Sequence, residues 1–453
     1  MTRLLPDDVL ADVLRRAAPR VVATARRVCS AWRALVDERR LLRRDLVPRS
    51  LAGFFIKYNE LPLPELFHRP STNLITGHHR MPKSRVHDHC NGVLLLFQGL
   101  LNPAAGWWAP LPKLQPPPRV GPEAERSRFY QDMYLVFDPA VSPHCEVFLI
   151  PRVPRRRDDY EIRKGRCVAD SAALLEMEWP PSPLTLNVFS TLTGRWGERS
   201  FSRGECEAAP GTIADMQKDH PYDHRHAVYW RGALYVHCEK DFVMRLSLSD
   251  GTYRMIQPPS CVQMCELPDF HLGRSEKGIY CALADDDGEL LVWVLDESRS
   301  PMEWALKHKS GRGLALARQS LNYISAQQVN GTWILDNANG REFNKDIEEP
   351  VDQESEWNSD DDEDVLITED RAENHQDGLF AILGFHPYKE IIFLHRGLSR
   401  GLAYHLNTSK LESLGSIFPK QYSRWAAQWE LNSSFPYTPC NRMAELTCST
   451  SSS

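Results

Sequence analysis

Residues 5–36 read LPDDVLADVLRRAAPRVVATARRVCSAWRALV, a run in which apolar side chains recur at helical spacing. Pro6 suits the first position of a helix, and the two aspartates after it favour the positive end of the helix dipole. A second short helix is expected after Pro19. A third is indicated by an apolar stripe at i, i+4, i+7 and i+8, made of Val28, Trp32, Leu35 and Val36. The sequence therefore predicts three short helices between residues 5 and 45.

The composition sets limits on the partners of the chain. Its 453 residues predict two or three domains, or one large repeat domain with a small one. The net charge is −6, and no aromatic residues interleave with the arginines of the helices, so no nucleic-acid partner is expected. No apolar run approaches the roughly 18 residues of a membrane span. We therefore expect a soluble protein of the nucleus and/or cytoplasm, with no membrane partner and with its 11 cysteines reduced.

From about residue 50 the pattern changes to short apolar runs separated by Gly, Pro, Asn and Asp turns, which is typical of strands. The clearest runs are 93–97, 134–137, 146–150, 233–236, 291–295 and 391–394. Long helical periodicities are missing. The remainder of the chain is therefore predicted to be all-β.

A loose repeat runs through this region, in which a strand ends in a polar turn and an aromatic residue opens the next strand. Copies lie at Asn102–Trp107, Thr191–Trp196 and Ser249–Tyr253, a weaker copy at Asn407–Leu411, and further units at Trp304 and Trp333. Adjacent copies are about 40 to 60 residues apart, which is the spacing of propeller blades. Six blades are favoured over seven, and a β-sandwich with ordinary turns is the alternative.

Three segments interrupt the repeat. Residues 112–122 are rich in proline and are expected to form an exposed loop. Residues 346–370 are dominated by aspartate and glutamate, which repel one another and supply no core, so a disordered insertion is expected. The serine-rich end at residues 449–453 is also expected to be disordered.

The segments Leu5–Leu10 and Val28–Val36 together resemble the F-box motif, which runs Leu-Pro-x-(Asp/Glu)-apolar-Leu and then Val-Cys-(Lys/Ser)-x-Trp-Arg-x-Leu-Ile. The resemblance implies a three-helix domain that binds a Skp-family adaptor and, through it, a cullin–RING ubiquitin ligase. The adaptor-binding residues that it implies are Leu5, Pro6, Val9, Leu10, Leu14, Val28, Trp32 and Leu35. The alternative for Trp32 is that it only fills the internal core of the three helices.

The β region is similar to the kelch-like, propeller-like F-box-associated regions of plant proteins. The matching segments are Cys90–Leu96, Asn102–Pro112, Phe137–Ala140 and His386–Glu390. The predicted fold is α+β and multidomain: an F-box (1–48), a linker and entry to the β domain (49–86), an all-β propeller-like domain (87–425) and a C-terminal tail (426–453). One departure concerns the second helix, where Ala17-Ala18-Pro19 and Ala25 are smaller than usual, so weaker adaptor binding than in a typical member is expected.

The leading hypothesis is a substrate-recognition subunit of an SCF-type ubiquitin ligase, which binds a target protein for degradation. It needs no catalytic residue, metal or cofactor, and no nucleotide-binding, hydrolase or zinc-protease motif is present. The histidines at 220–226 and the pair Cys261 and Cys265 lack the spacing of a metal site. Two alternatives stay open: an F-box scaffold outside a ligase, and a propeller enzyme such as a glycan hydrolase or oxidase.

Overall fold

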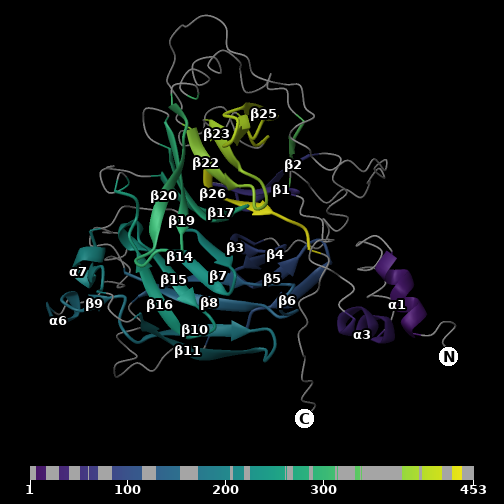
Figure 1. Ribbon diagram of the computed structural model, residues 1–453, viewed down its shortest axis with the longest axis horizontal. Helices are drawn as coiled ribbons and strands as arrows, with labels where there is room; N and C mark the ends of the chain where they lie inside the picture. The colour runs from purple at the N-terminus through teal and green to yellow at the C-terminus, as the bar shows by residue number, and fades with distance from the viewer. Residues whose placement is uncertain are drawn as a thin grey trace, which may run out of the picture.

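The computed structural model describes residues 7–16, 30–39, 51–59, 61–69, 84–114, 129–153, 172–204, 208–218, 225–260, 262, 269–284, 289–311, 314, 332–336, 338, 380–396, 400–420 and 431–440. Near the N-terminus lie two helices, α1 (Asp7–Arg16) and α3 (Ser30–Glu38). The expected second helix, the acidic segment 346–370 and the serine-rich end lie outside the described residues, as does most of the proline-rich segment. The rest is mostly β-strand (Figure 1).

Most of the described strands form six antiparallel units of four strands, which we number I to VI. Unit I holds β3 (Val86–Cys90), β4 (Val93–Leu96), β5 (Gly99–Asn102) and β6 (Trp107–Pro110). Unit II holds β7 (Tyr130–Val136), β8 (Glu146–Arg152), β10 (Leu184–Ser190) and β11 (Arg195–Arg203). Unit III holds β13 (Ala227–Trp230), β14 (Ala233–His237), β15 (Val243–Ser247) and β16 (Thr252–Ile256).

The other three units lie further along the chain. Unit IV holds β17 (Asp269–Ser275), β18 (Gly278–Ala284), β19 (Leu290–Asp296) and β20 (Glu303–Lys309). Unit V holds β22 (Phe380–Phe385), β23 (Ile391–Arg396), β24 (Arg400–His405) and β25 (Leu411–Gly415). Unit VI combines distant parts of the sequence in the order β21 (Ile334–Leu335), β2 (Glu65–His68), β1 (Gly53–Tyr58) and β26 (Leu431–Tyr437).

A short parallel strand pairing and several short elements accompany these units. Units II and III join into one eight-stranded sheet through a short parallel pairing of β11 with β16. Beside them lie α6 (Ala172–Leu175), α7 (Ile213–Met216), the 3₁₀ turn η3 (Glu239–Asp241) and the pair β9 (Glu178–Trp179) and β12 (Gly211–Thr212). Thr212 caps α7, because its side chain accepts a hydrogen bond from the backbone of Asp215 and the Asp215 carboxylate accepts one in return. The described residues hold no helix long and apolar enough to cross a membrane.

The inner strands β3, β7, β13, β17, β22 and β26 contact one another in that order, and β26 then contacts β3. The order returns to its start, so the six units surround a common centre. The closing contact depends on β26, which pairs along its length with β1 from the other end of the β region. Gly53 lies opposite Tyr437 in this pairing, and Phe55 lies opposite Phe435.

A hydrophobic cluster lies between each two neighbouring units of the described chain. Between units II and III, for example, Phe148 and Phe201 pack with Leu234 and Tyr253, and all four are buried. Full burial of one such side chain stabilises the fold by about 1.5–3 kcal/mol. The units are therefore held to one another by core packing and not only by strand pairing.

The aromatic repeat of the sequence marks the start of the fourth strand in five of the six units, and in unit V the corresponding strand, β25, begins with Leu411. Trp107 begins β6, and Trp196, Tyr253 and Trp304 are the second residues of β11, β16 and β20. Trp333 immediately precedes β21. Trp107, Tyr253 and Trp333 are buried, whereas Trp196 and Trp304 are only half-buried. The aromatic residues therefore occupy comparable positions in these five units, but only three of them belong to the buried core.

The described strands extend beyond the range 87–425 that was predicted for the β domain. β1 and β2 lie in the range 49–86, which we expected to be a linker and entry segment, and β26 lies in the expected tail at 426–453. β26 reads Leu-Asn-Ser-Ser-Phe-Pro-Tyr, and its serines and proline hide the strand pattern. Ser433, Phe435 and Tyr437 are nonetheless buried against β1 and its neighbours. The β region is therefore longer at both ends than the sequence indicates.

Candidate functional site

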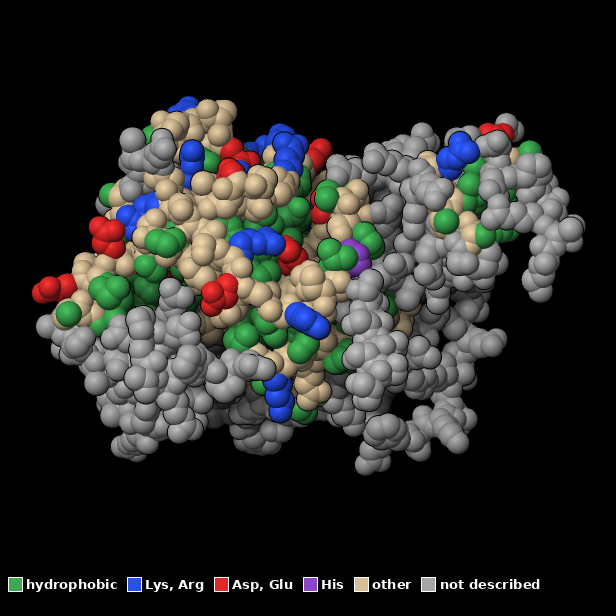
Figure 2. Space-filling model, turned by 90° about the horizontal axis from the view of Figure 1, so that it is seen from below, with side chains coloured by type: hydrophobic (Ala, Val, Ile, Leu, Met, Phe, Trp, Pro, Cys, Tyr) green, Lys and Arg blue, Asp and Glu red, His purple; other side chains and the backbone are tan. Residues whose placement is uncertain are grey.

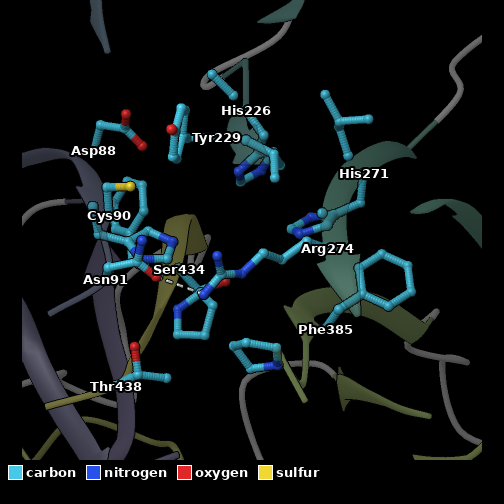
Figure 3. A pocket seen from close by; sticks show the side chains of 18 residues that line it. Asp88, Cys90, Asn91, His226, Tyr229, His271, Arg274, Phe385, Ser434 and Thr438 are labelled. Carbon is cyan, nitrogen blue, oxygen red and sulfur yellow. Dashed lines mark hydrogen bonds between the residues drawn. The ribbon is translucent and has the colours of Figure 1, made fainter. Parts of the chain in front are cut away.

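The inner strands enclose a cavity of about 60 Å³ at the centre of the β region. Five of the six units contribute to its wall, with Asp88 and Asn91 from unit I, His226 from unit III, Arg274 from unit IV, Phe385 from unit V and Ser434 from unit VI. Figure 3 shows these side chains converging on one space. The volume is far below the roughly 300 Å³ of a typical small-molecule pocket. The cavity can therefore hold a small chemical group and not a whole metabolite.

Arg274 reaches across this cavity from β17. Its Nη2 atom donates a hydrogen bond of 2.8 Å to Oδ1 of Asn91, in the turn after β3, as the dashed line in Figure 3 marks. Units I and IV are separated by two units on either side of the ring, so this bond spans the centre. The guanidinium also lies 5.7 Å from the ring centre of Tyr388, a cation–π distance.

The amide group of Asn91 is held in a fixed orientation. Its Nδ2 atom donates a 2.6 Å hydrogen bond to the carbonyl of Phe137, which leaves Oδ1 facing Arg274. Asn91 and Gly92 have φ values of 46° and 88°, as a tight Asn-Gly hairpin requires. A Cβ atom at Gly92 would lie 2.6 Å from the Thr438 carbonyl and from Cys440, so only glycine fits there.

Two other groups of the cavity wall are kept uncharged by burial. Burial raises the pKa of Asp88 to about 8, although Oδ2 of this carboxyl accepts a 2.7 Å hydrogen bond from the backbone of Leu135. Burial likewise raises the pKa of the Cys90 thiol to about 12, so this thiol is no activated nucleophile at neutral pH. Asp88 is thus largely protonated at pH 7, and Arg274 dominates the charge of the cavity.

Histidines form another part of the wall. The rings of His226 and His271 are 4.1 Å apart between centres, and His89 contacts Phe435 at 5.7 Å. His226 belongs to the histidine-rich segment 220–226, which the sequence does not predict to be a metal site. Among the residues that the structure describes, no three His, Cys, Asp or Glu side chains form a group that could hold a metal ion.

The second candidate site is the helix pair near the N-terminus. Leu10, Ala11 and Leu14 of α1 pack against Leu35 and Val36 of α3, and all five are buried. Trp32 is half-buried at the edge of this cluster. Val9 and Val13 point away from it, with exposed fractions of 46% and 54%. Since residues four apart lie on one face of a helix, Val9 and Val13 form an apolar face of α1 that no other described element covers.

Residues 2–48 match the F-box-like family model. The chain carries an F-box-like domain at its N-terminus. No curated protein matches the chain.

The predicted adaptor-binding residues take different positions in the F-box-like domain. Leu10, Leu14 and Leu35 face its interior, and Val9 faces outward. Leu5, Pro6 and Val28 lie outside the described residues. Val13 was not predicted as a surface residue, although its spacing from Val9 places both on one face. Hydrophobic side chains also show at the surface of the helical part of the molecule, at the upper right of Figure 2.

Proposed function

We propose that this protein is the substrate-recognition subunit of an SCF-type ubiquitin ligase and is not itself an enzyme. In this proposal the F-box-like domain binds a Skp-family adaptor, which connects it to a cullin–RING core, and the β region binds a target protein. The observation that carries the proposal is the F-box-like match at residues 2–48 together with the uncovered apolar face of α1. The protein would act in the nucleus and/or the cytoplasm.

The helix pair itself supports a partner at this face. Its described core consists of only five buried side chains, all of them Leu, Ala or Val. A domain of about 47 residues has a small core in any case, and such small domains often gain stability from a partner. Val9 and Val13 offer an apolar surface to such a partner, and Trp32 at the edge can serve as an aromatic anchor of the kind that dominates interface energies.

We further propose that the β region is a six-bladed propeller, with units I to VI as its blades. Support comes from the cyclic order of contacts between the inner strands and from the pairing of β26 with β1. The domains would then be an F-box at residues 1–48 and a propeller from β1 to β26. A closed ring presents its loops on two faces, and such loops are where binding specificity usually resides.

Adaptor capture tests the F-box assignment. The full-length protein should co-purify with a Skp-family adaptor, and the double variant Val9→Asp, Val13→Asp should lose this capture. Leu10 and Leu14 stay in place, so the helix pair keeps its core and the circular dichroism spectrum should not change. Val141→Asp introduces a carboxylate at a still more exposed valine of the β region and should capture the adaptor normally. Full capture by the double variant would refute binding through this face.

A second measurement separates a ligase subunit from a scaffold. A complex reconstituted with adaptor and cullin–RING core should transfer ubiquitin to a protein that the β region captures. If the protein binds the adaptor but no captured protein receives ubiquitin, the ligase role is contradicted. The hypothesis of an F-box scaffold outside a ligase then remains.

A further inference from the structure

Arg274 carries a positive charge that no described carboxylate balances. None of the ion pairs between described residues includes it. Its hydrogen bond to Asn91 uses one of the five N–H donors of a guanidinium. The side chain is half-buried in the wall of the central cavity. A cation in such a place is stabilised when an anion enters.

The surroundings fix this guanidinium for binding. Asn91 holds one edge of it from the opposite unit, and the Tyr388 ring lies under it at 5.7 Å. Asn91 is in turn anchored to the Phe137 carbonyl at 2.6 Å. A group that is already ordered loses little entropy on binding, so the remaining donors are preorganised. Figure 3 shows Arg274 extending into the middle of the cavity.

We propose that the central cavity binds the carboxylate of an Asp or Glu side chain from an extended segment of the target protein, with Arg274 as its partner. This assignment rests on the proposed function, which supplies the target protein. A guanidinium pairs a carboxylate through two parallel N–H···O bonds, and the planar anion matches the fork of donors. The carboxyl of Asp88 does not oppose an incoming anion at neutral pH, because burial keeps it protonated.

The size and charge of the cavity favour a carboxylate over a phosphate group as its ligand. A volume of about 60 Å³ is several times the roughly 10–15 Å³ that a cavity needs to hold one water molecule. A carboxylate head group fits there, and the rest of its chain has to remain outside. A phosphate group carries a charge of about −1.5 to −2 and three acceptor oxygens. The single guanidinium of Arg274 balances one negative charge, so a carboxylate is the better match although the fork of donors fits both groups.

Peptide selection tests this assignment. Full-length protein is presented with immobilised peptide pools of random sequence whose central position is fixed as Glu, Asp, Gln, Asn or phosphoserine. We expect retention on the Glu and Asp pools to exceed that on the Gln and Asn pools about 10-fold or more, the size of one charge-assisted pair. Equal retention on the Glu and Gln pools would overturn the proposal. Preference for phosphoserine over Glu would overturn the choice of a carboxylate.

Matched variants assign the effect to the cavity. Arg274→Gln should abolish the preference for acidic pools, and Arg274→Lys, which keeps the charge without the fork, should retain part of it. Arg231→Gln removes the same charge from an exposed arginine of the β13–β14 turn and should select peptides as the wild type does. An unchanged preference in Arg274→Gln would exclude this site.

Competition on the wild-type protein covers the case in which Arg274→Gln does not fold. Acetate should displace a selected acidic peptide, and acetamide at the same concentration should not; equal effects would overturn the proposal. The double variant Val9→Asp, Val13→Asp should keep the peptide preference. Failure of adaptor capture with normal peptide selection would thus refute the ligase role alone, and the reverse result would refute the carboxylate site alone.

Discussion

The carboxyl group of Asp88 connects the stability of the fold to pH. Burial raises its pKa from 3.8 to about 8, so the folded protein holds this proton more tightly than the unfolded chain does. The resulting stabilisation is complete below about pH 4 and is lost as the pH rises through about 8. Burial of this carboxyl group therefore costs the folded protein more stability as the pH rises from about 4 to about 8.

Asp88→Asn should remove this dependence, because an amide oxygen can still accept the Leu135 hydrogen bond and cannot ionise. We expect the variant to melt at a higher temperature than the wild type at pH 8 and to show little difference near pH 4, measured by thermal denaturation across the range. Asp88→Ala, which loses the acceptor, should be less stable at both ends. An Asp88→Asn offset that does not vary with pH would contradict the raised pKa.

Two arginine–carboxylate pairs in unit II differ in burial and allow a direct comparison. Arg152 is fully buried and donates to Asp132 at 2.8 Å, whereas Arg199 is 36% exposed and donates to Glu146 at 2.7 Å. Removing one member of a buried ion pair leaves the other buried polar groups without a hydrogen-bond partner, which costs stability. An exposed pair contributes little to stability. Arg152→Met should lower the free energy of unfolding by about 2–4 kcal/mol, and Arg199→Met by less than about 1 kcal/mol. Chemical denaturation measures both, and similar losses would refute the ranking.

At the scale of elements, the turn before the fourth strand is the part of the fold that the sequence reveals best. Gly106, Gly194 and Gly251 occupy it in units I, II and III with φ between 60° and 66°, and Ser409 takes the same conformation in unit V at 57°. This left-handed conformation favours glycine, which is why the turns can be recognised in the sequence. Ser409 explains why the copy in unit V looks weak.

Gly194→Ala should therefore destabilise the protein through its backbone alone. A Cβ atom there would meet nothing within 4 Å, so the expected loss of about 1 kcal/mol reflects the positive φ. Gly197→Ala, in the following strand, has equal space and no positive φ, and should be neutral or slightly stabilising. Denaturant melts of the two variants test the difference, and equal effects would show that the turn geometry does not set the cost.

The same local patterns could not reveal the cavity. Asn91-Gly92 indicates a hairpin, and the hairpin is there, but nothing near it in the sequence points to Arg274. The two residues meet because units II and III bring β17 to the far side of the ring from β3, and units V and VI complete the ring. Helical spacing likewise predicted α1 and α3, yet it did not separate the inward Leu10 from the outward Val13. The periodicity of the sequence identifies helices and strands. It cannot show which side chains meet across the molecule, because those contacts form only when the ring of strand units closes.

For the whole molecule, closure by β26 is the feature on which the other units depend. A chain that ends at residue 430 lacks the partner of β1 and the cavity residues Ser434 and Phe435. It leaves apolar surface of unit I uncovered, because Phe435 packs with Leu94 and Leu101, and it leaves the Leu383 carbonyl of unit V without the hydrogen bond that Ser434 donates. We expect this truncation to lose the cooperative thermal transition of the β region.

A chain that ends at residue 440 keeps every described strand and should retain that transition. Calorimetry of the two truncations is the measurement. A cooperative transition of normal enthalpy in the shorter chain would mean that the ring does not need its last strand.

The pairing of β1 with β26 also sets an order of events during synthesis on the ribosome. The helix pair emerges first, and β1 must then wait for nearly the whole remaining chain before its partner exists. At roughly 5–20 residues per second this wait lasts tens of seconds. The nascent chain thus exposes the Val9–Val13 face of α1 well before its β region can close. If the proposed function holds, an adaptor can bind before the β region is able to hold a target, and a prematurely terminated chain would occupy an adaptor without function.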